Sequence, residues 1–494
     1  VAVLVSTASR KHLVAQVMSQ PNSSVPLLSE KFNASAFDLL SVLERETVYL
    51  SPKNMLVAGA IVRLYIVPNG NSATPSRTAY QLLLENERER QILFPAAVYP
   101  NDDVEFSFKM FMSGTFKVTL FAEGTFKHND LPWRLPDFKS KDYFDMPNLD
   151  KLYQFDMELK EESINSSPRL RLESHLKTLP FCTPSSMDDF QQGGRFLIAT
   201  LFPTFQEGSG AGAQLIYLPP NCKLRYYSSN EATTCLQTQN ITVLGDSTSA
   251  ESVRDLLAHV TAQLTTKEWP ESSCTLNEPC AKIREFAYES PSSSPNSPST
   301  YITHIWGSTS HPCANGQGVI AYKDNQVFLD WTKFKISYPE FCHHFNESMA
   351  YSEKEWAVKG KWQSKPSKKQ DVLVYTSGLH DLQAISGGGE YKLEDYEVWL
   401  DRVMKELAPL ARTKVYVATN PTIGRHNFPN RYVNVVSRRV ARKNGFLFLD
   451  QNGAFIHRLN GDGGAMVGDW VHAHPRAIFT NTNAQLYLNA MCGK

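Results

Sequence analysis

The chain has 494 residues, of which 42% are hydrophobic and 20% are charged, a composition typical of a globular protein with more than one domain. Fifty basic residues balance 50 acidic ones, which leaves no electrostatic footprint for nucleic acid. No stretch reaches the roughly 18 apolar residues that span a bilayer, and neither a phosphate-binding loop nor a dinucleotide fingerprint indicates a cofactor.

The first part of the chain predicts an antiparallel β-sandwich. Residues 1–47 are polar and form an N-terminal extension, with a short helix expected in "SAFDLLSVLERE". From 48 to 130, short runs rich in Val, Phe, Tyr and Leu are separated by Gly, Pro, Asn and Asp, a pattern typical of sandwich strands. The run "FSFKMFMSGTFKVTLF" predicts a hairpin that turns at Ser113 and Gly114.

Weak periodicity at 131–235 predicts an irregular connector, and an α/β domain is expected from 236 to 494. In this last part, predicted strands alternate with predicted helices, which favours a parallel sheet flanked by helices. The strands are expected at 241–244, 371–378, 414–420 and 446–450. The helices are expected at about 248–265, 392–411, 429–444 and 481–491.

Ser247 lies where the predicted strand 241–244 meets a predicted helix, in the sequence "GDST". Such a corner lies at the carboxyl edge of a parallel sheet, where ligands bind. Free backbone N–H groups at the helix start would stabilise an oxyanion there. This favours Ser247 as a nucleophile, whereas the alternative is that Asp246, Ser247 or Thr248 only caps the helix.

A nucleophilic serine needs a base, and "VGDWVHAHPRA" offers one near the end of the chain. Asp469 and His472 have a spacing that lets the carboxylate receive one imidazole N–H and leaves the other nitrogen for Ser247. His474 is the alternative base. The remaining alternative is that both histidines are loop residues without a catalytic role.

Cysteines and glycosylation sequons favour the secretory pathway over the alternative, a cytosolic protein with reduced thiols. The even number of cysteines, without zinc-ligand spacing, predicts disulfides of open connectivity among Cys182, Cys222, Cys235, Cys274, Cys280, Cys313, Cys342 and Cys492. The open sequons are at Asn22, Asn33, Asn165, Asn240 and Asn346. Adjacent side chains diverge in "FCHHF", so no metal site is expected there.

Several short motifs occur in a characteristic order: "CLQTQNITVLGDST", "LVYTSGLHDL", "GFLFLD", "DWVHAHP" and "LYLNAMC". In these motifs the chain resembles the neurexophilin and PC-esterase family, a branch of the SGNH (GDSL-like) hydrolases. A Cys-Leu pair ten residues ahead of the GDST motif is a feature of that family, as Cys235 is here ahead of Gly245. The segment "FSFKMFMSGTFKVTLFAEG" also resembles the immunoglobulin- or filamin-like domain that precedes the family's esterase domain.

The resemblance implies a Ser-His-Asp triad of Ser247 as nucleophile, His472 as general base and Asp469 as orienting acid. It also implies an oxyanion hole formed by backbone N–H groups at Ser247 and near Gly378. In the family's central block a polar side chain contacts the oxyanion or the substrate. Cys235 and Cys492 are expected to be oxidised, each with a partner.

Two departures from the family pattern concern groups that would hold the oxyanion or the substrate. "SAE" at 249–251 stands where the family commonly has a basic residue followed by Gln or Asn, and Arg254 is the candidate replacement one turn further on. The central block lacks the usual Asn and has His380 and Asp381, so His380 is the candidate polar contact.

Two functions follow from these observations. The first is a secreted or lumenal serine esterase or O-acyltransferase that acts, without a cofactor, on O-acyl groups, above all O-acetyl groups, of glycans or glycoproteins. The alternative is a catalytically inactive, esterase-like extracellular protein with a glycan-binding, adhesive or assembly-forming role, including self-association. A likeness of fold does not by itself establish function.

Overall fold

The structure is a computed structural model. It describes residues 37–43, 46–69, 76–98, 103–127, 150–161, 167–188, 194–198, 215–236, 239–245, 247–261, 285–289, 301–306, 322–323, 326–327, 370–379, 381, 393–421, 427–456 and 479–493.

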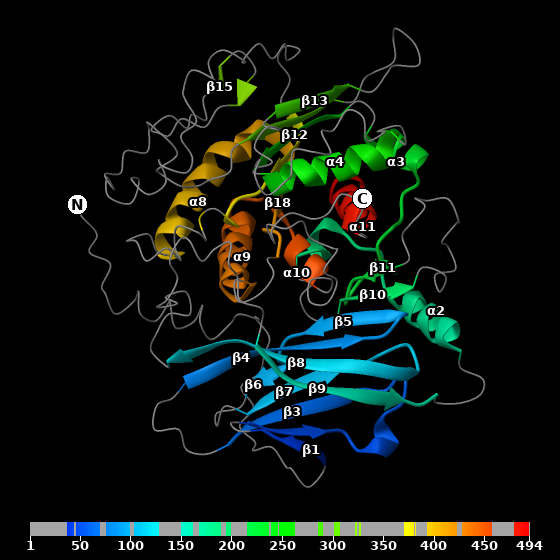
Figure 1. Cartoon of the computed structure of the whole chain (residues 1–494). Helices are drawn as coiled ribbons and strands as arrows, with labels where there is room; N and C mark the ends of the chain where they lie inside the picture. The colour runs from blue at the N-terminus through cyan, green and yellow to red at the C-terminus, as the bar shows by residue number, and fades with distance from the viewer. Residues whose placement is uncertain are drawn as a thin grey trace, which may run out of the picture.

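Two antiparallel sheets form the N-terminal part of the structure (Figure 1). The first has the order β1 (Asp38–Val42), β2 (Glu46–Leu50), β3 (Val62–Pro68), β7 (Val104–Phe108) and β6 (Ala97–Val98). The second has the order β11 (Leu215–Leu218), β10 (Arg195–Ile198), β5 (Glu89–Leu93), β4 (Ser76–Glu85), β8 (Gly114–Lys127) and β9 (Asp150–Leu159). Leu64 and Phe106 of the first sheet share one buried cluster with Leu82 and Phe116 of the second. The sheets therefore pack face to face, whereas the immunoglobulin- or filamin-like assignment stays a prediction.

The expected irregular connector at 131–235 instead supplies β9, β10 and β11 of the second sheet, together with helix α2 (Pro168–Thr178). β9 does carry a strand pattern, because Met157 and Leu159 are buried while Glu158 is exposed. The strand lies at the edge of its sheet, where polar side chains face solvent on most positions. These polar residues weaken the apolar signal on which the prediction depended.

The hairpin predicted at Ser113 and Gly114 is wrong, because its two strands lie in different sheets. β7 pairs with β3 in the first sheet, whereas β8 pairs with β4 and β9 in the second. The segment 109–113 therefore crosses from one sheet to the other. Alternating strands with a short connection fit either arrangement, and only the packing of the two sheets decides between them.

The short helix expected near residues 35–46 is also wrong, since residues 38–42 form the edge strand β1. β1 pairs with β2 in antiparallel register, with Asp38 opposite Leu50 and Val42 opposite Thr47. Helical spacing of apolar residues is a local preference, and pairing with a neighbouring strand overrides it here.

The C-terminal part is the predicted α/β unit, with a sheet that is parallel except for β13 at one edge. Its strand order is β13 (Glu285–Glu289), β14 (Tyr301–Trp306), β12 (Asn240–Gly245), β17 (Gln370–Tyr375), β18 (Ala411–Val417) and β19 (Leu447–Leu449). The helices are α3 (Ser229–Leu236), α4 (Ser247–Thr261), α8 (Leu393–Leu407), α9 (Asn427–Lys443), α10 (Gln451–Ile456) and α11 (Phe479–Cys492). The short elements of this part are the strands β15 (Tyr322–Lys323) and β16 (Gln326–Val327) and the 3-10 helix η8 (Ala408–Leu410). Two further 3-10 helices, η2 (Lys53–Met55) and η4 (Pro184–Ser186), lie earlier in the chain.

Helices cover both faces of the parallel sheet (Figure 1). Val243 and Val374 of the sheet share a buried cluster with Leu256 of α4 and Leu486 of α11. On the other face, Tyr416 of β18 contacts side chains of α8 and α9. The sheet is therefore buried on both sides, which explains its nearly continuous apolar strand sequences. Among the helices that the structure describes, none is long and apolar enough to cross a membrane.

The sandwich and the α/β unit share an apolar core. Ile92 and Phe196, on the outer face of the second sheet, lie in the same buried cluster as Val243 and Val374 of the parallel sheet. The segment before β10 adds polar contacts, since the Asp450 N–H donates to the Met187 carbonyl at 2.8 Å. The two units are therefore packed together and not merely joined by a linker.

Two disulfides connect segments that are distant in sequence. Cys235 at the end of α3 pairs with Cys492 at the end of α11, which confirms that both are oxidised. Cys182 pairs with Cys222. The other cysteines predicted to be oxidised lie outside the described residues: Cys274, Cys280, Cys313 and Cys342.

We expect the double variant Cys235→Ser with Cys492→Ser to lose about 5 kcal/mol of unfolding free energy, because the bridge restricts the unfolded chain. The matched control removes Cys182 and Cys222. Their bridge spans 40 residues instead of 257, so chain entropy predicts a loss smaller by about 1.6 kcal/mol. Urea unfolding of both variants measures the difference, and an equal loss would contradict the entropic explanation.

Candidate active site

Ser247 is the first residue of α4 and lies two residues after the end of β12, at the carboxyl edge of the parallel sheet. The strand–turn–helix corner predicted from the sequence is thus present. Helix α4 has 15 residues, and the backbone N–H groups of its first turn have no carbonyl partner within the helix. These groups and the positive end of the helix dipole favour a negative charge at this position.

Gly245, two residues before Ser247, is required by close packing of the corner. A Cβ atom at this position would collide with Thr376 Cγ2 and would lie 2.6 Å from Ser249 Oγ. Thr376 follows β17, the strand next to β12, and its backbone N–H donates to the Leu244 carbonyl at 3.0 Å. The corner at Ser247 is therefore packed directly against the segment that follows β17.

Gly378 lies in that segment, so the structure brings the Ser247 corner and the Gly378 segment to neighbouring strand ends. Its φ of +114° lies in the region that favours glycine. A Cβ atom here would lie 2.7 Å from Val433 Cγ1 of α9 and 3.0 Å from the Tyr396 hydroxyl of α8. Both conformation and space therefore require glycine at this position.

Arg254, the predicted substrate contact, is held in an ion pair within α4. Its guanidinium donates to Asp255 Oδ1 from Nε at 3.2 Å and from Nη2 at 3.1 Å. Burial alone would lower the pKa of Arg254, but the carboxylates of Asp255 and Glu251 raise it. Burial also raises the pKa of the Asp255 carboxyl, an effect that Arg254 opposes. Arg254 is thus charged and tied to its neighbour on the helix.

The remaining predicted site residues lie outside the described part of the chain: His380, Asp469, His472 and His474. Among the predicted glycosylation sites, Asn240 is the first residue of β12. The other sequons also lie outside the described residues: Asn22, Asn33, Asn165 and Asn346.

The chain is similar to esterase structures. LAE5, an alpha/beta hydrolase enzyme from the metagenome of Lake Arreo, Spain, is 14% identical over 54% of this chain and 97% of its own, with a TM-score of 0.29. Axe2, an acetylxylan esterase from Geobacillus stearothermophilus, is 13% identical over 52% of this chain and 94% of its own, with a TM-score of 0.28. No family model matches the chain, and no curated protein matches it in sequence.

A buried polar network next to the first turns of α4 was not predicted from the sequence. Ser252 Oγ donates to the Thr248 carbonyl at 3.1 Å and accepts from Asn483 Nδ2 of α11 at 3.1 Å. Gln451 Nε2 of α10 donates to Asn420 Oδ1 at 2.7 Å, at the end of β18. The network thus links α4 to α11, which itself follows the segment that contains Asp469 and His472.

A sequence signal for this network exists at one of its ends. Asn420 is the last residue of the predicted strand 414–420, in the sequence "ATNP", and a polar residue at a strand end marks the carboxyl edge of a parallel sheet. Gln451 directly follows the predicted strand 446–450 and has the same signal, whereas Asn483 lies within the predicted helix 481–491 and has none. Because they come from two different helices, only the tertiary structure brings them to Asn420 and α4.

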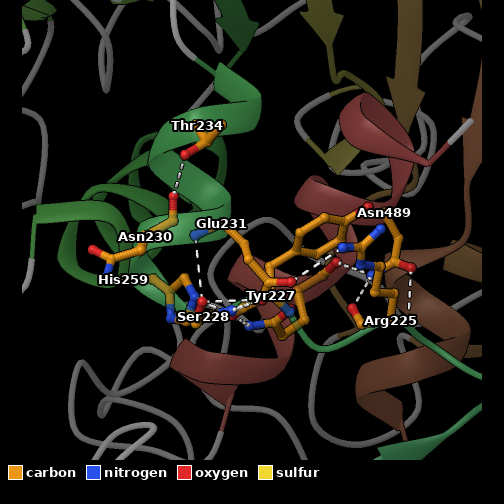
Figure 2. Close-up of polar contacts among 9 residues, drawn as sticks. Arg225, Tyr227, Ser228, Asn230, Glu231, Thr234, His259 and Asn489 are labelled. Carbon is orange, nitrogen blue, oxygen red and sulfur yellow. Dashed lines mark hydrogen bonds and ion pairs between the residues drawn. The ribbon is translucent and has the colours of Figure 1, made fainter.

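The far end of α4 is fixed against α3 and α11, as Figure 2 shows. His259 Nε2 lies 2.8 Å from the Tyr227 carbonyl, and burial lowers the pKa of this imidazole. The neutral ring therefore carries its proton on Nε2 and donates it to that carbonyl. Asn489 of α11 also pairs with both backbone groups of Arg225, at 3.0 Å to the N–H and 2.8 Å to the carbonyl.

The start of α3 completes this junction. Ser228 and Glu231 form a capping box, in which the Ser228 N–H donates to Glu231 Oε2 at 2.9 Å and the Glu231 N–H donates to Ser228 Oγ at 3.3 Å (Figure 2). Ser229 Oγ donates to the His259 carbonyl near the end of α4. Helix α4 is therefore anchored at both ends, which fixes the position of the Ser247 corner.

Proposed function

We propose that the chain is a serine esterase or O-acyltransferase that acts on O-acyl groups of glycans. The observation that carries this proposal is the position of Ser247 at the start of helix α4, after strand β12, whose neighbour β17 leads to Gly378. In this arrangement the backbone N–H groups at the start of the helix and of the Gly378 segment lie at neighbouring strand ends, where they could stabilise an oxyanion on a carbonyl attacked by the serine. The resemblance to the neurexophilin and PC-esterase family supports glycan O-acetyl groups as the substrate.

In the proposed reaction, Ser247 Oγ attacks the acyl carbonyl while His472 takes the hydroxyl proton. The oxyanion that forms is held by backbone N–H groups at Ser247 and Gly378. Collapse of the tetrahedral intermediate expels the sugar oxygen, which receives the proton from His472. An acyl-enzyme remains, and water or a second sugar hydroxyl then takes the acyl group.

The proposed setting is the secretory pathway or the extracellular space. The two disulfides support it, because such bonds persist mainly in oxidising compartments. In this setting the substrates are glycans or glycoproteins. The sequons at Asn22, Asn33, Asn165, Asn240 and Asn346 are proposed glycosylation sites of the chain itself.

One observation favours the alternative, an inactive esterase-like protein that binds glycans or assembles with itself. Arg254, the candidate replacement for the family's basic residue, is committed to Asp255. Asp255 in turn accepts from Asn483 Nδ2 at 3.0 Å, so the pair is part of the structural contact between α4 and α11. A substrate group would have to compete with this ion pair.

A serine-directed fluorophosphonate probe tests the proposal. We expect the full-length protein to be labelled and Ser247→Ala to lose all labelling, because the probe forms a bond with an activated serine oxygen. Ser229→Ala is the matched control. Ser229 is also the first residue of a helix, but its hydroxyl donates to the His259 carbonyl, so labelling should persist. An unlabelled, folded wild-type protein would favour the inactive alternative.

A further inference from the structure

A cluster of four buried hydroxyl groups lies beneath the Gly378 segment. It consists of Ser377, Tyr396 of α8, Tyr416 of β18 and Ser437 of α9, each fully or almost fully buried. The Tyr416 hydroxyl lies 2.7 Å from the Ser377 carbonyl oxygen. Tyr396 lies 2.7 Å from Ser437 Oγ, which donates to the Val433 carbonyl at 2.8 Å.

Each hydroxyl proton of this cluster can be assigned to one acceptor, because each hydroxyl group has a single proton to donate. Ser437 uses its proton on the Val433 carbonyl, so it accepts from Tyr396. The Ser377 carbonyl cannot donate, so Tyr416 uses its only proton on that oxygen. Burial raises the pKa of the Tyr416 hydroxyl, which therefore keeps this proton at neutral pH. Among the side chains that the structure describes, Tyr416 is the one whose hydroxyl donates to the carbonyl of the peptide that joins Ser377 to Gly378.

This hydrogen bond fixes the direction of the Gly378 N–H. The Ser377–Gly378 peptide is planar and trans, so its carbonyl and its N–H point in opposite directions. Tyr416 holds the carbonyl toward the face of the sheet that α8 and α9 cover. The N–H then points toward the opposite face, which is covered by α4, the helix that starts with Ser247.

The Gly378 N–H has no acceptor among the residues that the structure describes. Gly378 is buried, and buried N–H groups without a partner are rare because each one costs free energy. A buried donor next to the Ser247 corner, for which the described residues supply no acceptor, has the property that an oxyanion hole requires. The preceding carbonyl, by contrast, accepts a hydrogen bond from Tyr416.

We propose that Tyr416 is a positioning residue for the oxyanion hole, holding the Ser377–Gly378 peptide so that its N–H faces the acyl group attacked by Ser247. This inference rests on the proposed esterase function. Tyr416 touches neither substrate nor nucleophile and acts only through the peptide. Its loss is therefore expected to lower kcat more than it changes KM, because the oxyanion forms only after binding.

Turnover of p-nitrophenyl acetate by the full-length protein tests the inference. We expect Tyr416→Phe to lower kcat about tenfold, below the 100- to 1,000-fold typical of losing an oxyanion donor, because the N–H remains but is less well fixed. KM should change less than about twofold. Tyr396→Phe is the matched control, since it removes a hydroxyl from the same cluster that does not bond the peptide. Its kcat should stay within about twofold of the wild type.

Ser377→Ala provides a second variant in case Tyr416→Phe does not fold. It retains the Ser377 carbonyl but removes Oγ, which lies 3.2 Å from the Tyr416 hydroxyl, so a smaller loss of kcat is expected. Equal kcat values for Tyr416→Phe and Tyr396→Phe, at similar melting temperatures, would overturn the inference and leave the esterase function intact. If Tyr416→Phe does not fold, a wild-type kcat for Ser377→Ala overturns it. Absence of turnover that depends on Ser247 would instead overturn the esterase function and the inference with it.

Discussion

His472→Ala should lower kcat for ester hydrolysis on the order of a million-fold, the largest effect expected for a single substitution in this chain. Removing the histidine of a Ser-His-Asp triad costs about as much as removing the whole triad, because an unactivated serine is a poor nucleophile. Steady-state hydrolysis of p-nitrophenyl acetate, with Ser247→Ala as the reference for complete loss, measures this effect.

His474→Ala is the matched control for this prediction. His474 lies two residues further along the same segment but has no carboxylate at the Asp-x-x-His spacing that Asp469 gives to His472. We therefore expect His474→Ala to keep most of the activity. If His474→Ala loses turnover while His472→Ala retains it, His474 is the base and the assignment of His472 is wrong.

Glu89→Gln should lower the unfolding free energy by about 3–5 kcal/mol, the largest stability loss expected outside the candidate active site. Glu89 is completely buried and accepts from Arg195 Nη1 at 2.8 Å. Its other oxygen accepts the backbone N–H groups of Phe111 and Met112 at 2.8 and 2.9 Å. Glutamine removes the negative charge and leaves the buried Arg195 without a counter-ion.

Urea unfolding followed by circular dichroism measures this loss, with Glu173→Gln as the control. Glu173 pairs with Arg169 at 2.9 Å on the exposed surface of α2, where an ion pair contributes at most about 0.5 kcal/mol. Similar losses for the two variants would show that Glu89 does not hold the crossing between the sheets. Because 109–113 is that crossing, the melting of the sandwich should respond most strongly to Glu89→Gln.

The location of the candidate nucleophile could be predicted from the sequence, because local patterns determine it. An apolar run, a glycine and an amphipathic run predict a strand, a tight turn and a helix, and the structure has β12, Gly245 and α4 at these positions. The end of the predicted helix 429–444 is equally local, because Gly445 follows it and adopts a φ of +72° after α9.

The assignment of strands to sheets could not be predicted in the same way. The sequence pattern of β7 and β8 is that of a hairpin, yet the strands pair with different partners in two sheets. β9 to β11 complete the second sheet although their surroundings suggest a connector. Strand pairing depends on partners far away in the chain, and a period-2 pattern states only which side of a strand is buried.

By itself, the sequence determined the parallel α/β unit, the strand–turn–helix corner at Ser247 and the oxidation of Cys235 and Cys492. Each of these depends on spacing along the chain or on residue type. Only the tertiary structure decided the two-sheet arrangement, the pairing of Cys235 with Cys492, and the bond from Tyr416 to the peptide before Gly378. The physical reason is that a single hydrogen bond or disulfide between distant segments leaves no periodic trace in the sequence, whereas a buried helix face or strand does.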